Sequence, residues 1–271
     1  MEVILGRSVL EEKILQSTCE LRETSALTAA GVLYPLWDSG YWWKCFKIAI
    51  VRENSMKINR MAVVQGLNLE PVSGQSRYGC GMTDFEDFYE IAEYADTKGY
   101  RGNQIVFGDY ETGEIYIPFE KERNIAYSGV EWIEGYFYFL KADFNKKMVS
   151  IIKYRPDGEC NEYFSIGMNE VELYNLRIVG TPAHLISQDE EMRCYYPEQF
   201  SITLSPRESV IEIEDNRIYC SCWEEEGVAE GEITEDYQYY EKLIVRNRFG
   251  DVVSEEPGAL TRLPDGRWWL S

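Results

Sequence analysis

A short hairpin pattern recurs through the second half of this 271-residue chain at nearly constant spacing. In each copy an apolar segment meets a tight turn containing Gly, Asn or Asp, and a second apolar or aromatic segment comes after it. The four copies cover residues 130–140, 171–179, 210–222 and 260–270. Their turns fall at residues 135, 175, 216 and 266, at intervals of 40, 41 and 50. Alternation at period two broken by such turns predicts antiparallel β-hairpins.

A second series of turns interleaves with the first. Gly113, Gly158 and Gly250 mark turns of further hairpins, and they are 45 and 92 residues apart, the latter being twice 46. The missing copy is expected between Met192 and Leu204, where Pro197 stands in place of the glycine turn. Two series with nearly the same period predict a repeat unit built from an inner and an outer hairpin.

Repeats of 40 to 50 residues built on hairpins are typical of propeller blades. Over about residues 100–271 the chain therefore resembles β-propeller repeat proteins in architecture, without the motifs of the WD or kelch classes. We predict an all-β, β-propeller-like fold that spans residues 1–271 as a single domain. Counting inner hairpins, with one more at 32–46, predicts about five blades, whereas the average blade length allows six. An irregular β-sandwich with coincidental turn spacing is the alternative.

The ring needs a closing device, because the last inner hairpin ends with the chain at Ser271. Strands within residues 2–22 could supply its outer neighbours, so that strands from both termini close the ring and no sheet edge stays open. One helix is also expected. Thr83 and Glu86 have the spacing of a capping box, and apolar residues come after them at helical intervals. We predict a helix at about 84–96, within an insertion at 80–100.

Charge and composition exclude several classes of protein. The 47 acidic side chains against 27 basic ones give a formal net charge of −20, which repels phosphate backbones, so no nucleic-acid partner is expected. The longest uncharged stretch, residues 24–37, is too short and too polar to cross a bilayer, so no membrane partner is expected. The N-terminus does not have the pattern of a signal peptide, and seven widely spaced cysteines do not resemble a secreted disulfide framework. These features predict a cytoplasmic protein.

The sequence offers few candidates for catalysis or for cofactor binding. His184 is the only histidine, and no Gly-x-Ser-x-Gly motif accompanies it, so we expect a structural histidine at the start of a strand. Cys220 and Cys222 alternate along a predicted strand and are expected to be buried thiols on one face. Neither a zinc ligand set nor a calcium loop is present, so no metal or cofactor is predicted.

The strongest binding candidate is the segment 224–241, which holds eight acidic residues and no Lys or Arg. We expect it to be a connection between strands whose acidic, tyrosine-edged surface docks a basic protein partner. A second candidate is the hairpin of Asp38 and Trp42. The predicted binding residues are Asp38, Trp42, Trp223, Glu224, Glu225, Glu226, Tyr237 and Tyr239.

These features favour a non-catalytic cytoplasmic binding or scaffold protein whose loop face recognises a basic protein. The alternative is a carbohydrate-binding or glycoside-hydrolysing propeller that uses clustered carboxylates and Trp platforms, so a glycan or small-molecule ligand is left open. Three carboxylates close together in an axial pocket lined by Trp would favour this alternative. A plugged axis would favour the scaffold.

Overall fold

The computed structural model describes residues 58–61, 67–156, 158–229 and 232–271. The chain divides into two compact units, Met1–Asn59 and Arg60–Ser271, and nearly all of the described residues belong to the second. The predicted hairpin of Asp38 and Trp42 and the closing strands within 2–22 lie outside the described residues.

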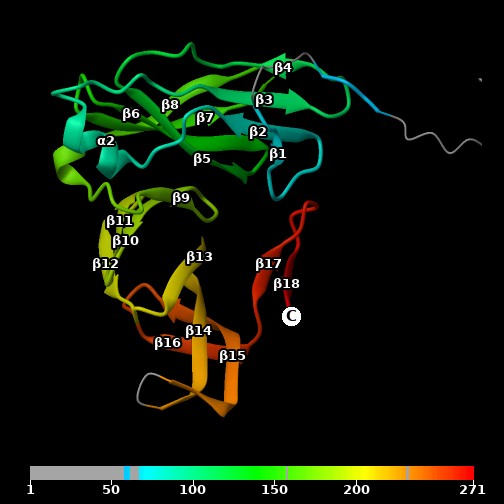
Figure 1. The fold of residues 1–271 in the computed structure, drawn as a ribbon, viewed down its shortest axis with the longest axis vertical. Coiled ribbons are helices and arrows are strands. Elements are labelled where there is room, and N and C mark those ends of the chain that lie inside the picture. Colours follow the sequence, from blue (N-terminus) through cyan, green and yellow to red (C-terminus); the bar gives the residue numbers. More distant parts are fainter. Residues whose placement is uncertain (1–57, 62–66, 157, 230–231) are drawn as a thin grey trace, which may run out of the picture. The chain divides into compact units, whose positions relative to one another are not determined.

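Four antiparallel sheets of four strands each make up most of the described structure, and consecutive strands are neighbours in every sheet (Figure 1). The first contains β1 (Glu70–Pro71), β2 (Tyr78–Met82), β3 (Ile105–Asp109) and β4 (Ile115–Tyr116). The second contains β5 (Ile125–Ile133), β6 (Tyr136–Asp143), β7 (Met148–Tyr154) and β8 (Cys160–Gly167). The third contains β9 (Arg177–Val179), β10 (His184–Gln188), β11 (Glu191–Tyr196) and β12 (Phe200–Thr203). The fourth contains β13 (Glu208–Glu214), β14 (Arg217–Ala229), β15 (Glu232–Asn247) and β16 (Val252–Pro257).

The sheets are arranged as the blades of a four-bladed β-propeller, which confirms the predicted all-β, propeller-like fold. The predicted count of five blades is wrong by one. The hairpin at 260–270 does form, as β17 (Leu260–Arg262) and β18 (Trp268–Leu270), but it is a separate two-stranded sheet. The β1–β2 hairpin was missed because β1 has only two residues, too few to show an alternating pattern.

Two of the inner hairpins form at the predicted turns for a local reason. Glu134 and Gly135 both have positive φ, 48° and 85°, and Asp215 and Asn216 have φ of 47° and 62°. Positive φ at both central residues matches the right-handed twist of the flanking strands, and Asn, Asp and Gly adopt it most easily. The third inner hairpin differs from the prediction.

The expected hairpin at 171–179 is wrong in its pairing. Asn175 does occupy a turn, with φ of 51°, and the Leu176 N–H donates to the carbonyl of Leu173 at 3.4 Å. However, 171–173 is not a strand, because the chain reaches it directly from the short 3₁₀ helix η1 (Met168–Glu170). The β9 strand therefore pairs with β10, the next strand along the chain.

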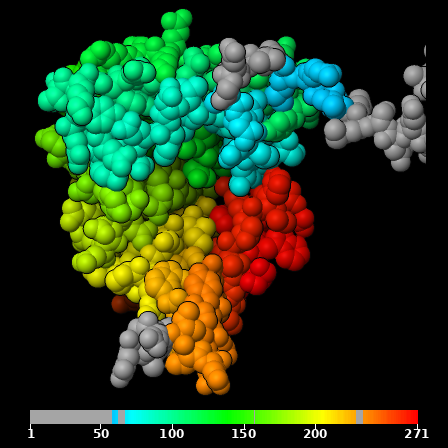
Figure 2. All heavy atoms as spheres, in the orientation of Figure 1, coloured from blue at the N-terminus to red at the C-terminus, as the bar shows by residue number. Residues whose placement is uncertain are grey.

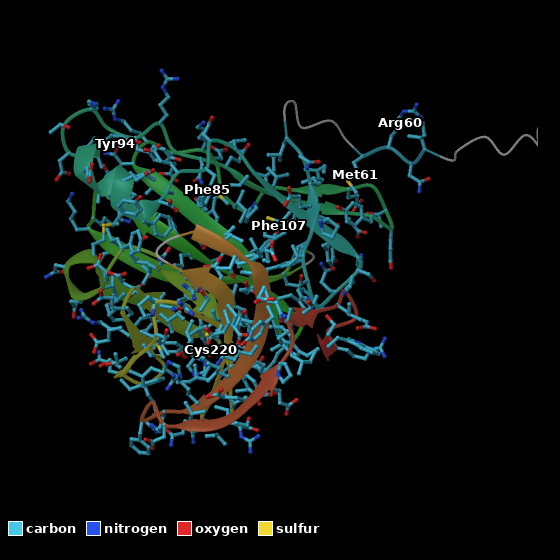
Figure 3. The ribbon with its side chains drawn as sticks, turned by 60° about the horizontal axis from the view of Figure 1, so that its bottom comes forward. Arg60, Met61, Phe85, Tyr94, Phe107 and Cys220 are labelled. Atoms are coloured by element: carbon cyan, nitrogen blue, oxygen red, sulfur yellow. The ribbon has the colours of Figure 1, made fainter. Side chains whose placement is uncertain are left out.

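Three hydrophobic clusters fill the spaces between neighbouring sheets. The first joins the β1–β4 and β5–β8 sheets through aromatic rings, with Phe107 and Phe137 4.7 Å apart between ring centroids. The second joins the β5–β8 sheet to the β9–β12 sheet and to the helix. The third joins the β9–β12 and β13–β16 sheets and includes Cys220. Phe107 and Cys220 lie among crowded side chains in Figure 3. Each large apolar side chain that is fully buried contributes about 1.5–3 kcal/mol.

The predicted helix is present as α2 (Phe88–Tyr94), with Phe88 and Ile91 buried. It is shorter than the range 84–96, and the capping box does not form. The Thr83 hydroxyl instead accepts a hydrogen bond from the Gln104 N–H at 2.9 Å, and Asp87 occupies the N-cap position without capping through its side chain.

Candidate functional site

The predicted binding residues of the second unit lie on a two-stranded extension of the β13–β16 sheet. β13 pairs with β14 only up to Cys222, and β16 pairs with β15 only from Lys242 onward. Beyond those points β14 and β15 pair with each other alone. We call this extension, residues 223–229 and 232–241, the arm. In Figure 1 the arm reaches past the ends of β13 and β16.

The arm is a β-ribbon, so the expectation of a connecting loop at 224–241 is wrong. Cross-strand hydrogen bonds explain the difference, because the Tyr237 hydroxyl donates to Glu225 Oε1 and the Tyr240 hydroxyl donates to Glu226 Oε1, both at 2.9 Å. Tyrosine is a good strand former, and each of these hydrogen bonds holds across the two strands a carboxylate that was expected to be solvated in a loop.

The register divides the candidate residues between two faces. Glu225 pairs with Tyr239, and Trp223 pairs with Glu241, so these four side chains share one face with Tyr237. Glu224 and Glu226 lie on the opposite face. The side chains of Trp223 and Tyr239 are 39% and 55% exposed, so the first face presents two accessible aromatic surfaces among carboxylates.

Glu224, at the base of the arm, is neutralised by two cations. Arg207 Nη1 lies 2.7 Å from Glu224 Oε2, and Lys242 Nζ lies 2.9 Å from Glu224 Oε1. The hydrogen bond from Lys242, and then that from Arg207, lowers the pKa of Glu224 below its usual value. Arg207 also lies 5.1 Å from the Trp223 ring centroid, a cation–π distance.

A second site lies on the axis of the propeller, where the alternative prediction placed a carboxylate cluster, but its residues were not predicted from the sequence. A cavity of about 750 Å³ opens where the four blades and the β17–β18 hairpin meet. In the space-filling view the surface is hollowed where the cyan, green, yellow and red parts of the chain approach each other (Figure 2). We call this cavity the axial pocket. Its charged lining residues are Glu70, Glu131, Glu212 and Arg262, and the thiol of Cys80 also lines it.

Two β-bulges precede the glutamates of the axial pocket. The register of β5 with β6 shifts between Tyr127 and Val130, immediately before Glu131. The register of β13 with β14 shifts between Val210 and Glu212. Bulges redirect side chains and are frequent beside functional sites. Both inner strands are therefore irregular at the point where each presents a carboxylate.

The pocket walls raise the pKa of both glutamates, although Glu212 is half-buried and Glu131 is exposed at the surface. Burial raises the pKa of Glu131 more than the charges of Arg262 and Arg177 lower it. Burial raises the pKa of Glu212 to about 7, with smaller contributions from the charges of Glu131 and Glu214, while Arg262 acts in the opposite direction. A carboxyl group with a pKa near 7 can take up or release a proton at neutral pH.

Arg262 lies at the pocket wall without an anionic partner among the described residues. Its Nη2 donates to the carbonyl oxygen of Trp132 at 3.2 Å, whereas its Nε is buried without a hydrogen-bond acceptor in the described part of the chain. Its guanidinium lies 5.7 Å from the Trp268 ring centroid and packs against Gly74, where a Cβ atom would come within 3.0 Å of Cζ.

A smaller cavity of about 380 Å³ shares Gly129, Val130 and Glu131 with the axial pocket. Arg177 lines it and donates to Gln188 Oε1 at 2.9 Å and to the Val210 carbonyl at 3.1 Å. Burial lowers the pKa of Arg177. Throughout the described part of the chain, neither Arg177 nor Arg262 forms an ion pair with a carboxylate within 4.0 Å.

One sequence signal could have indicated the pocket. Glu131 and Glu212 each stand within the apolar inner segment of a predicted hairpin, close to its turn. Arg262 has the same kind of position in the last hairpin. The excess of acids elsewhere in the chain concealed this pattern.

The remaining predicted chemistry is structural. His184 is the first residue of β10, and its Nδ1 lies 2.6 Å from the Pro182 carbonyl oxygen. Burial lowers the pKa of His184. Cys220 and Cys222 are buried free thiols on β14, as expected. The described residues contain no cluster of three His, Cys, Asp or Glu able to hold a metal ion, and none of their helices could cross a membrane.

Comparison with known proteins adds no relative. No family model, no curated protein and no solved structure matches this chain.

Proposed function

We propose that the protein is a non-catalytic binding protein of the cytoplasm that docks a basic protein through its arm. The observation that carries the proposal is a two-stranded ribbon with acidic side chains and exposed aromatic rings beyond the edge of its sheet. The free thiols among the described cysteines agree with a reducing compartment.

The arm has the properties of a surface that gains stability from a partner. A two-stranded hairpin is at best marginally stable in water unless something packs against it. Trp223, Tyr239 and Tyr240 are 39%, 55% and 37% exposed, and such residues often dominate binding energy at interfaces.

Charge selects the class of partner. Residues 223–241 contain no Lys or Arg, and within the described structure Arg207 and Lys242 pair only with Glu224 among the acids of the arm. The other acids would attract a partner of opposite charge, speed its association and disfavour acidic competitors.

The test compares protein baits that differ only in where charge is reversed. The bait Glu225→Lys/Glu226→Lys reverses the arm, and Glu90→Lys/Glu93→Lys makes the same charge change on α2. A second arm bait, Trp223→Ala/Tyr239→Ala, removes the aromatic anchors. Proteins retained from lysate at low salt are quantified by mass spectrometry and then purified for calorimetry with each variant.

The proposal predicts one basic protein that binds the wild type and the α2 bait, that high salt releases, and that both arm baits lose. Equal binding to all baits, or no stoichiometric binding to the wild type, would overturn it.

The axial pocket favours a second candidate, the binding or hydrolysis of a saccharide. Glu131, Glu212 and Trp268 line one cavity, and Glu70 brings a third carboxylate to its wall. Glycoside hydrolysis uses a protonated and an ionised carboxyl group, and the raised pKa of Glu212 suits the protonated role. Binding and hydrolysis of a glycan panel by the wild type, Glu131→Gln and Glu212→Gln test this candidate. Activity that survives both substitutions would refute it.

A further inference from the structure

Among the described residues, the charges of the axial pocket lie unpaired in a cavity that is open on one side, where Glu212 and Arg262 are half-buried and Glu131 is exposed. Charges that are partly removed from water are normally paired or hydrogen-bonded, because the removal is costly. Here the charges of Arg262 and Arg177 act on Glu131, yet no ion pair within 4.0 Å joins either arginine to a carboxylate in the described structure.

The unmet donor is the most specific feature of the pocket. The Nε–H of Arg262 is buried and has no acceptor among the described residues. A buried donor left without an acceptor costs about 1–3 kcal/mol. The residue as a whole is half-buried and lines the pocket, so the rest of its guanidinium is open to a ligand acceptor. The guanidinium is also held in place, since Nη2 binds the Trp132 carbonyl and the flat face packs against Gly74.

We propose that the axial pocket binds a sugar acid, with the carboxylate of the ligand on Arg262 and its hydroxyl groups on Glu131 and Glu212. This inference deepens the second proposed function, on which it rests only for the use of the same pocket, and it requires no hydrolysis. The guanidinium edge matches a carboxylate in shape and charge.

The other walls fit the rest of such a ligand. Carboxylate oxygens accept hydrogen bonds from hydroxyl groups, and the Trp268 ring offers an apolar surface to the C–H face of a sugar. A volume of about 750 Å³ lies within the usual range for small-molecule pockets, about 300–1,000 Å³.

The ligand carboxylate would bring another negative charge close to the glutamates. The charged groups that act on Glu212 are Arg262, Glu131 and Glu214, while Glu70 and the thiol of Cys80 line the same pocket. The charge of Arg177, which lines the neighbouring smaller cavity, acts on Glu131. A proton on Glu212 would relieve the repulsion, and the raised pKa of this group makes that proton available near neutral pH. Binding should therefore weaken as the pH rises from 6 to 8, by up to about tenfold per pH unit once Glu212 is ionised.

Matched ligands with and without a carboxylate separate the contribution of the acid group to binding from that of the sugar ring. Methyl glycosides of glucuronic, galacturonic and mannuronic acid are titrated calorimetrically beside the corresponding neutral glucoside, galactoside and mannoside. At pH 6 we expect at least one uronide to bind at least about tenfold more tightly than its neutral counterpart, since a hydrogen bond to a charged group contributes about 1.5–3 kcal/mol.

Variants assign the effect to Arg262. Arg262→Gln should lose this preference, and Arg267→Gln is the control, since Arg267 lies exposed on the same hairpin and pairs with Asp265. Urea denaturation checks that both variants fold. If Arg262→Gln fails to fold, Trp268→Ala with the pH series provides the test, with weaker uronide binding and an unchanged pH dependence expected.

Three outcomes would overturn the inference: no uronide bound at millimolar concentration, equal binding of uronide and neutral glycoside, or an uronide preference retained by Arg262→Gln. Tight binding of a neutral glycoside alone would refute the sugar acid while leaving saccharide binding in the pocket standing.

Discussion

Glu212 and Glu224 belong to the same β-sheet, on the neighbouring strands β13 and β14, yet their pKa values shift in opposite directions. Glu212 faces the axial pocket, where burial raises its pKa to about 7. Glu224 stands at the base of the arm, where Lys242 and Arg207 lower its pKa. With 47 acidic residues in the chain, the number of acids carries little information, and the surroundings of each decide its chemistry.

Glu208 lies in a third kind of environment, and its substitution should have the largest effect on the free energy of unfolding. It is buried on β13, and its two carboxylate oxygens accept hydrogen bonds from Nε and Nη2 of Arg246, both at 2.7 Å. Glu208→Gln leaves the enclosed guanidinium unpaired and should lower the free energy of unfolding by about 3–5 kcal/mol. Urea denaturation measures this loss. The same substitution at Glu191, in an exposed pair with Arg193, should have little effect, and similar losses at both positions would contradict the distinction.

Glu212→Gln should have a smaller effect that depends on pH. A carboxyl group whose pKa is higher in the folded than in the unfolded state weakens folding as the pH rises between the two values. The variant, which cannot ionise, should therefore be more stable than the wild type at pH 8, on the order of 1–2 kcal/mol, and the difference should vanish near pH 4. Denaturation curves at pH 4, 6 and 8 measure the trend. A difference that does not change with pH would refute the raised pKa.

Glu224→Gln should give the smallest effect, with the opposite dependence on pH. The pKa of Glu224 is lowered in the folded state, so its contribution is present above the unfolded pKa and is lost as the pH falls through the folded value. The side chains of Glu224 and Lys242 are 23% and 25% exposed and that of Arg207 is 44% exposed, so the loss of these solvent-accessible ion pairs should cost only a small part of the stability lost in Glu208→Gln at pH 7, measured by urea denaturation. A clear destabilisation that persists in high salt would show that Glu224 has a structural role beyond surface charge.

The sequence predicted those parts of the fold that local chemistry determines. The turns at 134–135 and 215–216 were found because positive φ at two successive residues selects Gly, Asn and Asp. Strand pairing was harder to predict from the sequence. The similar turn at Asn175 leads into β9, but β9 pairs with β10 and not with the segment before the turn. The predicted count of five included the hairpin at 260–270, which forms a separate two-stranded sheet, and the hairpin at 32–46, which lies outside the described residues. The blade that begins with β1 was missed, because a two-residue strand shows no alternating pattern.

The two candidate sites also differ in how far the sequence alone could predict them. The arm residues are contiguous in sequence, so composition pointed to them, although only the register shows that Glu225 and Glu224 face opposite sides. The axial pocket collects Glu131, Glu212 and Arg262 from three separate sheets. No local pattern specifies that these side chains meet, because the meeting depends on how the blades are arranged around their axis.

The opposite pKa shifts of Glu212 and Glu224 within one sheet are tested most directly by a carboxyl ¹³C NMR titration of protein labelled at the glutamate side chains. Glu212→Gln and Glu224→Gln assign the two resonances by their disappearance. We predict a Glu212 resonance that titrates near pH 7 and a Glu224 resonance that titrates below the usual glutamate range. A Glu212 resonance that titrates at or below the ordinary glutamate pKa would contradict the account of the axial pocket.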